Sequence, residues 1–363
     1  MQGSTIKQIS DHHIRHQQFS SDTSNPYLWH LQKFLVIQTA FIGDVVLATG
    51  IVEKLHAYFP EAEIDFLVRK GNEGLLSSHP YLHEVLVWNK KDGKIKDLRR
   101  LLHIIRGRQY DKVINVQRFA ATGILTAFSG ATEKIGFDKN PLSALFTTRI
   151  KHVISTSHQP KHEIERNNDL VAPFTDQVVF KPRLYPSHND YASVQPYKQA
   201  PYICVAPSSV WFTKQYPAAK WISFIQQLPA NLAVYLLGAP SDAALCDAII
   251  AAVAGRNTFN LCGKLSFLQS AALMKDARMN YVNDSAPMHF ASAVNAPVTA
   301  VYCSTLPSFG FGPVSDASFV VETNEPLACR PCGLHGRKAC PLGHFKCAFT
   351  IQEQQLLDTM SDV

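Results

Sequence analysis

Residues 34–50 read FLVIQTAFIGDVVLATG, and this stretch decides the fold class. Residues 34–37 are an apolar run with the length of a buried strand, and a loop follows as far as Gly43. From Asp44 to Tyr58 the apolar residues recur with the spacing of a helix. A buried strand that passes through a short loop into a helix is the first part of a β-α-β unit. The stretch therefore predicts an α/β protein whose parallel sheet is covered on both faces.

The same alternation continues in two blocks along the chain. The first block has strand patterns at 64–68, 85–88 and 113–116 and an amphipathic helix at 94–106. The second has strand patterns at 202–205, 233–237, 279–282 and 298–302, with helices at 218–227, 242–253, 266–275 and 286–294. Prolines and polar residues at 183–201 separate the blocks. We therefore expect two doubly wound halves, with a ligand cleft beyond the carboxyl ends of their strands.

Length and composition agree with two packed domains and exclude several other classes. The chain has 363 residues, 46% of them hydrophobic and 18% charged, so bulk disorder and a small disulfide scaffold are excluded. The first thirty residues lack the apolar core of a secretory signal, and no run of about 18 apolar residues predicts a membrane-spanning helix. Cysteines 204, 246, 262 and 303 lie in apolar surroundings typical of reduced core thiols. We expect a cytoplasmic protein.

Three strand-to-helix loops carry residues suited to chemistry. Asp44 lies at the start of the first helix, where it can accept backbone N–H bonds or face a ligand. The loop PSSVWFTKQYP (207–217) combines hydroxyls with one lysine, which suits a phosphate but also an ordinary surface loop. In NDSAPMH (283–289), Asp284 or Ser285 can cap a helix whose N-terminus favours an anion. No GxGxxG follows the first strand, which disfavours a nicotinamide enzyme.

Taken together, the three motifs resemble glycosyltransferase family 9, which includes the ADP-heptose:lipopolysaccharide heptosyltransferases. The resemblance rests on GDVVLATG, PSSxxxTKxxP and NDSAPMHxASA, followed by Phe311-Gly312-Pro313, and it covers about residues 33–350. It implies a GT-B fold, in which two Rossmann-like domains face each other across a cleft. It also implies inverting, metal-independent transfer of a sugar from a nucleotide donor to a lipid-linked oligosaccharide. The expected reaction moves a heptose from ADP-heptose to the inner core of lipopolysaccharide.

The sequence patterns predict a division of the chain, and the resemblance implies the role of each half. We expect a polar tail at 1–30, an acceptor-side domain at 31–185, a linker at 186–200, a nucleotide-sugar domain at 201–350 and a C-terminal helix at 351–363.

Residue roles carry over position by position. Asp44 matches the family's general base, and Gly43 and Arg118 are expected on the acceptor side. The residues expected at the donor are Ser208, Ser209, Thr213, Lys214, Asp242, Leu265, Asp284, Ser285, Ala286 and His289. Among these, Lys214 matches the lysine at the donor phosphates, Asp242 an acid for the ribose and Leu265 an apolar contact for the base. Ala286 replaces the family's usual glycine, and alanine adopts positive φ less readily; if this position must approach a phosphate closely, we expect a slightly different geometry.

Two further features lie outside these motifs. Cys329, Cys332, Cys340 and Cys347 fall within nineteen residues and could bind a structural Zn²⁺; the alternative is a reduced or partly disulfide-bonded loop. No metal is expected in the transfer step. Residues 90–108 hold eight Lys/Arg and two Asp, a local net charge of +6 (8 − 2). This basic face suits the anionic inner leaflet of the inner membrane, or it is a solvated helix surface. No nucleic-acid module is visible.

Other functions stay open from the residues. The chain could use another nucleotide-sugar or glycan acceptor within the same family. A sugar-nucleotide-binding protein of the same fold without transfer activity is a second alternative, and a hydrolase or epimerase is a third.

Overall fold

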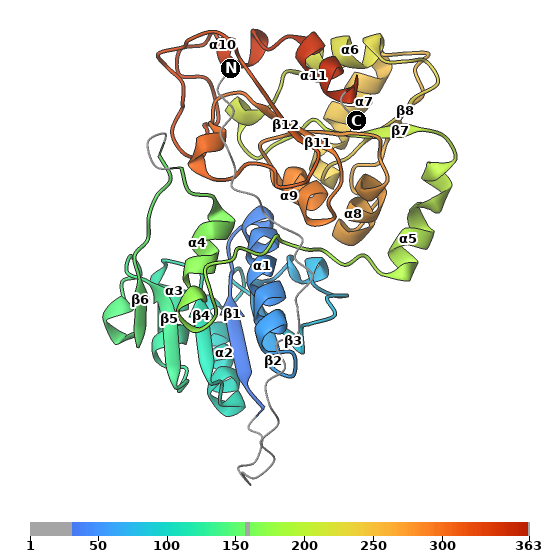
Figure 1. Cartoon of the computed structure of the whole chain (residues 1–363). Coiled ribbons are helices and arrows are strands. Elements are labelled where there is room, and N and C mark those ends of the chain that lie inside the picture. Colours follow the sequence, from blue (N-terminus) through green and yellow to red (C-terminus); the bar gives the residue numbers. More distant parts are fainter. Residues whose placement is uncertain (1–30, 157–159, 362–363) are drawn as a thin grey trace.

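The structure is a computed structural model that describes residues 31–156 and 160–361, the last of them by its backbone only. The predicted tail, residues 1–30, lies outside the described residues. Two layered α/β units are stacked on each other, with the amino-terminal unit in blue and green and the carboxyl-terminal unit in yellow to red (Figure 1).

A six-stranded parallel sheet forms the centre of the first unit, in the order β3-β2-β1-β4-β5-β6. Its strands are β1 (Lys33–Ile37), β2 (Glu63–Arg69), β3 (Glu84–Trp88), β4 (Lys112–Asn115), β5 (Glu133–Phe137) and β6 (Thr148–Ile150). Its helices are α1 (Ile42–Tyr58), α2 (Lys94–Arg108), α3 (Ala120–Ala127) and α4 (Glu163–Asp169). The sheet grows in opposite directions from β1 and β4, which makes this pair the topological switch point.

The second unit repeats this arrangement, in the order β12-β11-β10-β7-β8-β9. Its strands are β7 (Tyr202–Ala206), β8 (Ala233–Leu236), β9 (Thr258–Asn260), β10 (Asn280–Asn283), β11 (Val298–Tyr302) and β12 (Ser318–Glu322). Its helices are α6 (Ala218–Gln227), α7 (Ala243–Ala252), α8 (Phe267–Lys275), α9 (Ala286–Ala293), α10 (Lys346–Phe349) and α11 (Glu353–Ser361). The switch point lies between β7 and β10. The two parallel sheets confirm the predicted α/β fold.

The segment between the sheets is partly helical. Residues 188–198, inside the predicted linker, form α5 (His188–Val194) and a short 3-10 turn, η4 (Gln195–Lys198). Ser187 caps α5 by accepting a hydrogen bond from the N–H of Asp190. α5 packs against α8 of the second unit, at the edge of the molecule in Figure 1.

The two units share a packed interface beside the switch points. Helices α1 and α9 pack on each other, and one cluster of buried apolar side chains includes residues from both sheets. Gly50 of α1 lies so near the crossing chain that a Cβ there would come within 2.6 Å of the Phe180 carbonyl oxygen. The buried Lys54 ammonium donates hydrogen bonds to the carbonyls of Asp176 and Val178 in the same crossing segment, each at 2.7 Å, and so holds that segment against α1. These contacts fix α1, and with it the loop after β1.

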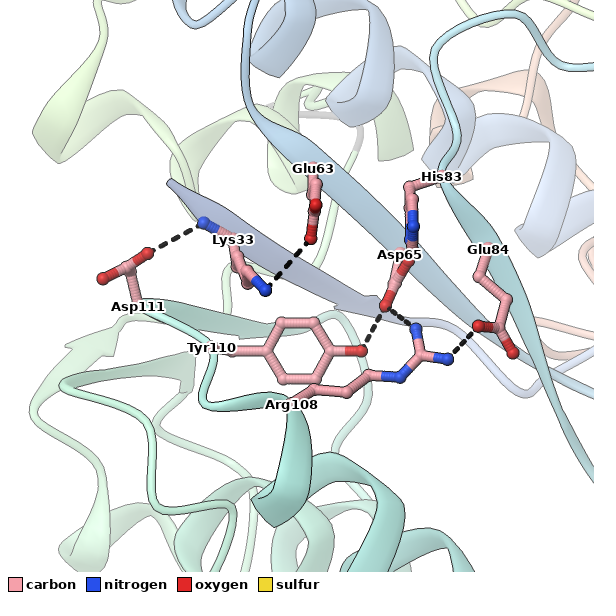
Figure 2. A network of polar contacts seen from close by, with 8 residues as sticks. All are labelled: Lys33, Glu63, Asp65, His83, Glu84, Arg108, Tyr110 and Asp111. Carbon is pink, nitrogen blue, oxygen red and sulfur yellow. Dashed lines mark hydrogen bonds and ion pairs between the residues drawn. The ribbon is translucent and has the colours of Figure 1, made fainter. Parts of the chain in front are cut away.

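A network of charged side chains closes the amino end of the first sheet (Figure 2). Asp65, at 2% exposure, accepts hydrogen bonds from Arg108 and Tyr110, and its other oxygen lies 3.0 Å from Nδ1 of His83. Arg108 also bonds Glu84. Each charged side chain in Figure 2 has a hydrogen-bond or ion-pair partner, so this network stabilises the amino end of the sheet.

Candidate functional site

The candidate site lies at the opposite, carboxyl end of the strands, where the switch points of the two sheets meet. The loop after β1 leads to Asp44, and the loop after β4 carries Arg118. From the second sheet, the loop after β7 carries Lys214, and Asp284 follows β10 directly. Four segments far apart in the sequence therefore converge because parallel strands end at the same edge of each sheet.

Asp44 is the third residue of α1, and the N-cap is Phe41. Its carboxylate accepts hydrogen bonds from the backbone N–H groups of Phe41 and of Asp44 itself. Burial raises the pKa of Asp44 above its usual value, although these two bonds and the charges of His335 and Arg69 act in the opposite direction. The helix start and the carboxylate thus support each other, and burial increases the proton affinity of the carboxylate.

A second buried carboxyl group, Glu163, lies within electrostatic reach of Asp44. Glu163 starts α4 and forms an ion pair with Arg166 at 2.8 Å. Burial raises the pKa of Glu163 to about 7; Arg166 and Arg118 oppose this shift, whereas the charge of Asp44 adds to it. Two carboxyl groups with raised pKa values and a nearby arginine are a pattern typical of sites that handle protons.

On the other side of the site, Lys214 and Asp284 form a partly buried ion pair. Nζ of Lys214 lies 2.7 Å from Oδ2 of Asp284, and the Thr305 hydroxyl donates to the same oxygen at 2.6 Å. The pair joins the loop after β7 to the end of β10. Lys214 is partly exposed and Asp284 is buried, so the ammonium is the half of the pair that a ligand can reach.

The buried Asn283 side chain fixes the shape of the lysine loop. Its Nδ2 donates to the Pro207 carbonyl at 2.9 Å, and its Oδ1 accepts from the N–H of Tyr216 at 2.9 Å. Both ends of the loop are therefore attached to the end of β10. Ser208 and Ser209 lie partly exposed on this loop, whereas Thr213 is fully buried and its hydroxyl already bonds Ser304 and Arg337.

Asp242 lies in the segment after β8, and Leu265 lies in the segment after β9. The carboxylate of Asp242 accepts from the Ser208 hydroxyl at 2.9 Å and from the N–H of Ala239 at 2.8 Å. Leu265 is half-buried and packs against the main apolar cluster. The structure thus brings Ser208 and Asp242 together, and Leu265 follows the neighbouring strand, β9.

The N-terminus of α9 has ordinary backbone geometry. Ser285 is the N-cap, and its hydroxyl donates to the Asn283 carbonyl at 3.3 Å. Ala286 begins the helix and is not among the described residues with positive φ. The backbone at Ala286 therefore needs no positive φ in this chain, and a change of geometry near a bound phosphate stays a prediction.

His289 connects the two halves of the site. It is buried on α9, and a Cβ added to Gly43 would lie 2.7 Å from its Cδ2, so only glycine fits beside it. Burial lowers the pKa of His289 to about 4; the charges of Lys214 and His162 add to this shift, and Asp284 opposes it. Its Nδ1 has no hydrogen-bond partner within the described part of the chain. The neutral His289 imidazole therefore contacts Gly43, the residue before Asp44, and its pKa depends on the charges of Lys214 and Asp284.

The four clustered cysteines line one cavity of about 230 Å³, together with His344, Arg337 and Thr213. All four are free thiols, and the Sγ of Cys329 lies 3.9 Å from Nε2 of His344. Among residues 31–156 and 160–361, no three His, Cys, Asp or Glu side chains converge closely enough to hold a metal ion as they stand.

Several residues of the site were not identified from the sequence. Glu163, Arg166, Thr305 and His335 lie in segments without a strand-to-helix motif, and only the fold brings them to Asp44 and Asp284. Asn283 was part of a quoted motif, but its role as the anchor of the lysine loop depends on contacts that are 76 residues apart in the chain.

Comparison with known proteins gives a consistent picture. The profile of glycosyltransferase family 9 (heptosyltransferase) matches residues 98–337. Lipopolysaccharide heptosyltransferase 3 of Escherichia coli is 27% identical over 283 residues, which is 73% of this chain and 82% of that protein.

Two solved structures share the fold. E. coli ADP-heptose lps heptosyltransferase II superposes with a TM-score of 0.74 at 22% identity and covers 91% of this chain and 98% of its own. E. coli heptosyltransferase WaaC with ADP has a TM-score of 0.71 at 17% identity, with 91% and 99% covered. These structures confirm the predicted arrangement of two Rossmann-like units.

Proposed function

The chain belongs to glycosyltransferase family 9, and we propose that it transfers a heptose from ADP-heptose to the inner core of lipopolysaccharide. Membership makes it a glycosyltransferase with lipopolysaccharide heptosyltransferases as relatives. The proposed reaction rests on one observation: His289 contacts Gly43, beside the partly buried Asp44, and lies within electrostatic reach of Lys214 and Asp284. A proton acceptor and a phosphate-binding cation therefore face the same space.

The carboxyl-terminal unit supplies the donor side of this proposal. Lys214, the Ser208 and Ser209 hydroxyls and the N-terminus of α9 offer positive charge and donors to a diphosphate. When the diphosphate takes the ammonium, Asp284 is released to bind a hydroxyl of the donor sugar. Asp242 is assigned to the ribose and Leu265 to the base. The solved structure of WaaC contains ADP, which supports an adenine nucleotide as the donor.

Asp44 acts as the general base in a single displacement. The acceptor oxygen forms a bond to the anomeric carbon while the bond from that carbon to the diphosphate oxygen breaks, and its electron pair leaves with ADP. The hydroxyl proton passes to Asp44, whose raised pKa suits this task. Lys214 and the α9 N-terminus stabilise the charge that develops on the leaving diphosphate. The leaving group needs no proton donor, so one carboxylate suffices.

The amino-terminal unit supplies an acceptor side that suits an acidic, partly apolar molecule. Nζ of Lys90 bonds the Thr39 carbonyl at 2.7 Å, and burial, together with Arg69 and Lys94, lowers the pKa of Lys90 to about 8. Arg69 lies over the ring of Phe41, which is 61% exposed on the loop after β1. Arg118 lies on the loop after β4, the strand that pairs with β1. The rim of the site therefore combines cations with an exposed aromatic ring.

Membrane contact is part of the proposal. No described helix is long and apolar enough to cross a bilayer. The exposed face of α2 carries Lys94, Lys96, Arg99, Arg100 and Arg106, with Ile95 at 67% exposure among them. We expect sedimentation with vesicles that contain anionic lipid and weaker binding to neutral vesicles. Equal binding to both kinds of vesicle would contradict a peripheral site at the inner leaflet.

The four cysteines have no role in the transfer step, and we propose that they hold a structural Zn²⁺. The site residues for the reaction, Asp44, Lys214 and Asp284, lie outside the cysteine set.

Product analysis tests the proposed function. The purified protein is incubated with ADP-heptose and a lipopolysaccharide whose inner core ends before the heptoses. We expect the acceptor mass to rise by one heptose for each ADP released. Free heptose formed without acceptor would indicate a hydrolase, and donor binding without any product would indicate a binding protein.

A further inference from the structure

The segment between β12 and α10 is unusually long for a connection without regular structure. Residues 323–345 contain no helix or strand, and most of their side chains are exposed. Loops of this length inside a compact domain are uncommon and usually have a function. Few large apolar side chains point inward here, so burial of apolar surface does not by itself explain the shape of the loop. We call residues 327–347 the cysteine loop.

The inward side of the cysteine loop is lined by thiols. Cys329, Cys332, Cys340 and Cys347 all line the cavity of about 230 Å³, and His344 lies at its edge, 3.9 Å from the Cys329 sulfur. A tetrahedral Zn–S site has bonds of about 2.3 Å. Among the described residues, no three His, Cys, Asp or Glu side chains are close enough together to hold an ion as they stand. A change of χ1 rotamer moves a cysteine sulfur by about 3 Å, and the cavity leaves room for such a movement.

The charge of the cysteine loop matches a tetrathiolate site. Four thiolates around one Zn²⁺ have a net charge of −2, which needs nearby cations. Arg337, Lys338 and Lys346 lie in the loop, and the sequence has no acid between Glu325 and Glu353, whereas Arg330 already pairs with Glu322 at 2.6 Å. Arg337 lines the same cavity as the sulfurs.

Two hydrogen bonds attach the cysteine loop to the proposed donor side. The N–H of Arg337 donates to the Thr213 hydroxyl at 2.7 Å, and the N–H of Thr213 donates to the Arg337 carbonyl at 3.1 Å. Gly336 has a φ of +77°, and a Cβ there would lie 3.1 Å from the Cγ of Lys214. The preceding residue, His335, lies within electrostatic reach of Asp44.

A second attachment lies near Cys332. Its N–H donates to the Ser304 carbonyl at 2.9 Å, and the next residue, Thr305, bonds Asp284 at 2.6 Å. The same loop therefore contacts the neighbours of both members of the Lys214–Asp284 pair.

We infer that Cys329, Cys332, Cys340 and Cys347 bind one Zn²⁺ and that this ion holds residues 335–337 against Thr213 and Lys214, so that the donor nucleotide can bind. The coupling half of this inference rests on the proposed function; the ion site does not. Without the ion, the loop samples other conformations, and only a fraction of the molecules present Lys214 in the binding position. The ion takes no part in the transfer chemistry.

Metal analysis tests the ion site. Protein purified under reducing conditions without chelators is measured by plasma mass spectrometry and by titration of free thiols. We expect about one Zn²⁺ per chain, loss of the ion in Cys332→Ser and retention in the control Cys204→Ala, whose thiol is buried in β7. Iron in place of zinc would support the ligands and overturn the choice of ion. Metal-free protein that takes up no added Zn²⁺, or disulfides among the four cysteines, would overturn the site.

Calorimetry with ADP tests the coupling on wild-type protein before and after removal of the ion, with circular dichroism as a check on folding. We expect affinity for ADP to fall by about tenfold on removal and to return with one equivalent of Zn²⁺. Unchanged affinity in folded, stripped protein would overturn the coupling. If the metal-loaded protein binds no ADP, the proposed donor and the coupling are wrong, whereas bound zinc would still support the ion site.

Discussion

The two ends of the first sheet use their polar side chains in opposite ways. At the amino end, Asp65 is nearly inaccessible and is surrounded by Arg108, Tyr110 and His83 (Figure 2). At the carboxyl end, Asp44 is partly buried and Glu163 is buried, and the pKa values of both carboxyl groups are raised. The same backbone scaffold therefore has a closed charge network at one end and proton-accepting groups at the other.

The polar side chains at the two ends contribute free energy to different processes. A buried carboxylate with full partners stabilises the fold, and removing one partner leaves an uncompensated charge. A buried carboxyl group with a raised pKa is less stable as the anion, and this makes it a better proton acceptor. Substitutions at the amino end should therefore mainly lower stability, and those at the carboxyl end should change activity or the pH dependence of stability.

Asp44→Asn should have the largest effect on activity. Without the carboxylate the acceptor proton has no positioned base, so we expect kcat/KM for transfer to fall by about 10²–10⁴-fold. Affinity for ADP should stay within a few-fold of wild type, measured by calorimetry on the same preparation. Wild-type turnover in this variant would refute the base assignment.

Arg108→Ala should have the largest effect on stability. It leaves the Asp65 carboxylate buried with fewer partners, and we expect the free energy of unfolding in urea to fall by about 3 kcal/mol. The matched control is Arg100→Ala, which removes a half-exposed pair with Asp97 and should change stability by less than about 1 kcal/mol. A loss of kcat/KM in folded Arg108→Ala protein would contradict the separation of the two ends.

Lys214→Met should weaken donor binding. The variant keeps the length of the side chain but removes the charge that we propose binds the diphosphate, and we expect affinity for ADP to fall by about 10–100-fold. Lys220→Met is the control, because Lys220 pairs with Glu353 of α11, away from the site. Equal effects of the two substitutions on ADP affinity would argue against a specific phosphate contact.

Glu163→Gln should change the pH dependence of stability. Because the pKa of Glu163 is raised from 4.5 to about 7, its contribution to stability is fully present below about pH 4.5 and is lost as the pH rises through 7. Relative to the variant, wild type should therefore lose at most about 3 kcal/mol of unfolding free energy between pH 4.5 and 8. Urea titrations of both proteins at the two pH values measure this. A constant difference between the proteins would mean that the carboxyl group titrates normally.

The sequence predicted those parts of the molecule that depend on local patterns. Asp44, Lys214 and Asp284 each follow a buried strand closely, so the fold rule alone places them at one edge. β5 was missed because Glu133–Phe137 mixes charged and apolar residues, and β6 and β9 were missed because each is only three residues long; β12 was missed as well. Glu163 and His335 were missed because their proximity to Asp44 depends on tertiary contacts that no local spacing encodes. Whether the assigned residues bind donor and acceptor stays a prediction.

Calorimetric titration with ADP, UDP, GDP and CDP is the most direct test of the proposal that the donor is an ADP-sugar bound through Lys214. The wild-type protein and Lys214→Met are measured in parallel. A ligand that binds only the folded state also raises the thermal midpoint, which gives an independent readout. We expect selective binding of ADP that is weakened in the variant. Selective binding of another nucleoside diphosphate, or ADP binding that does not depend on Lys214, would contradict it.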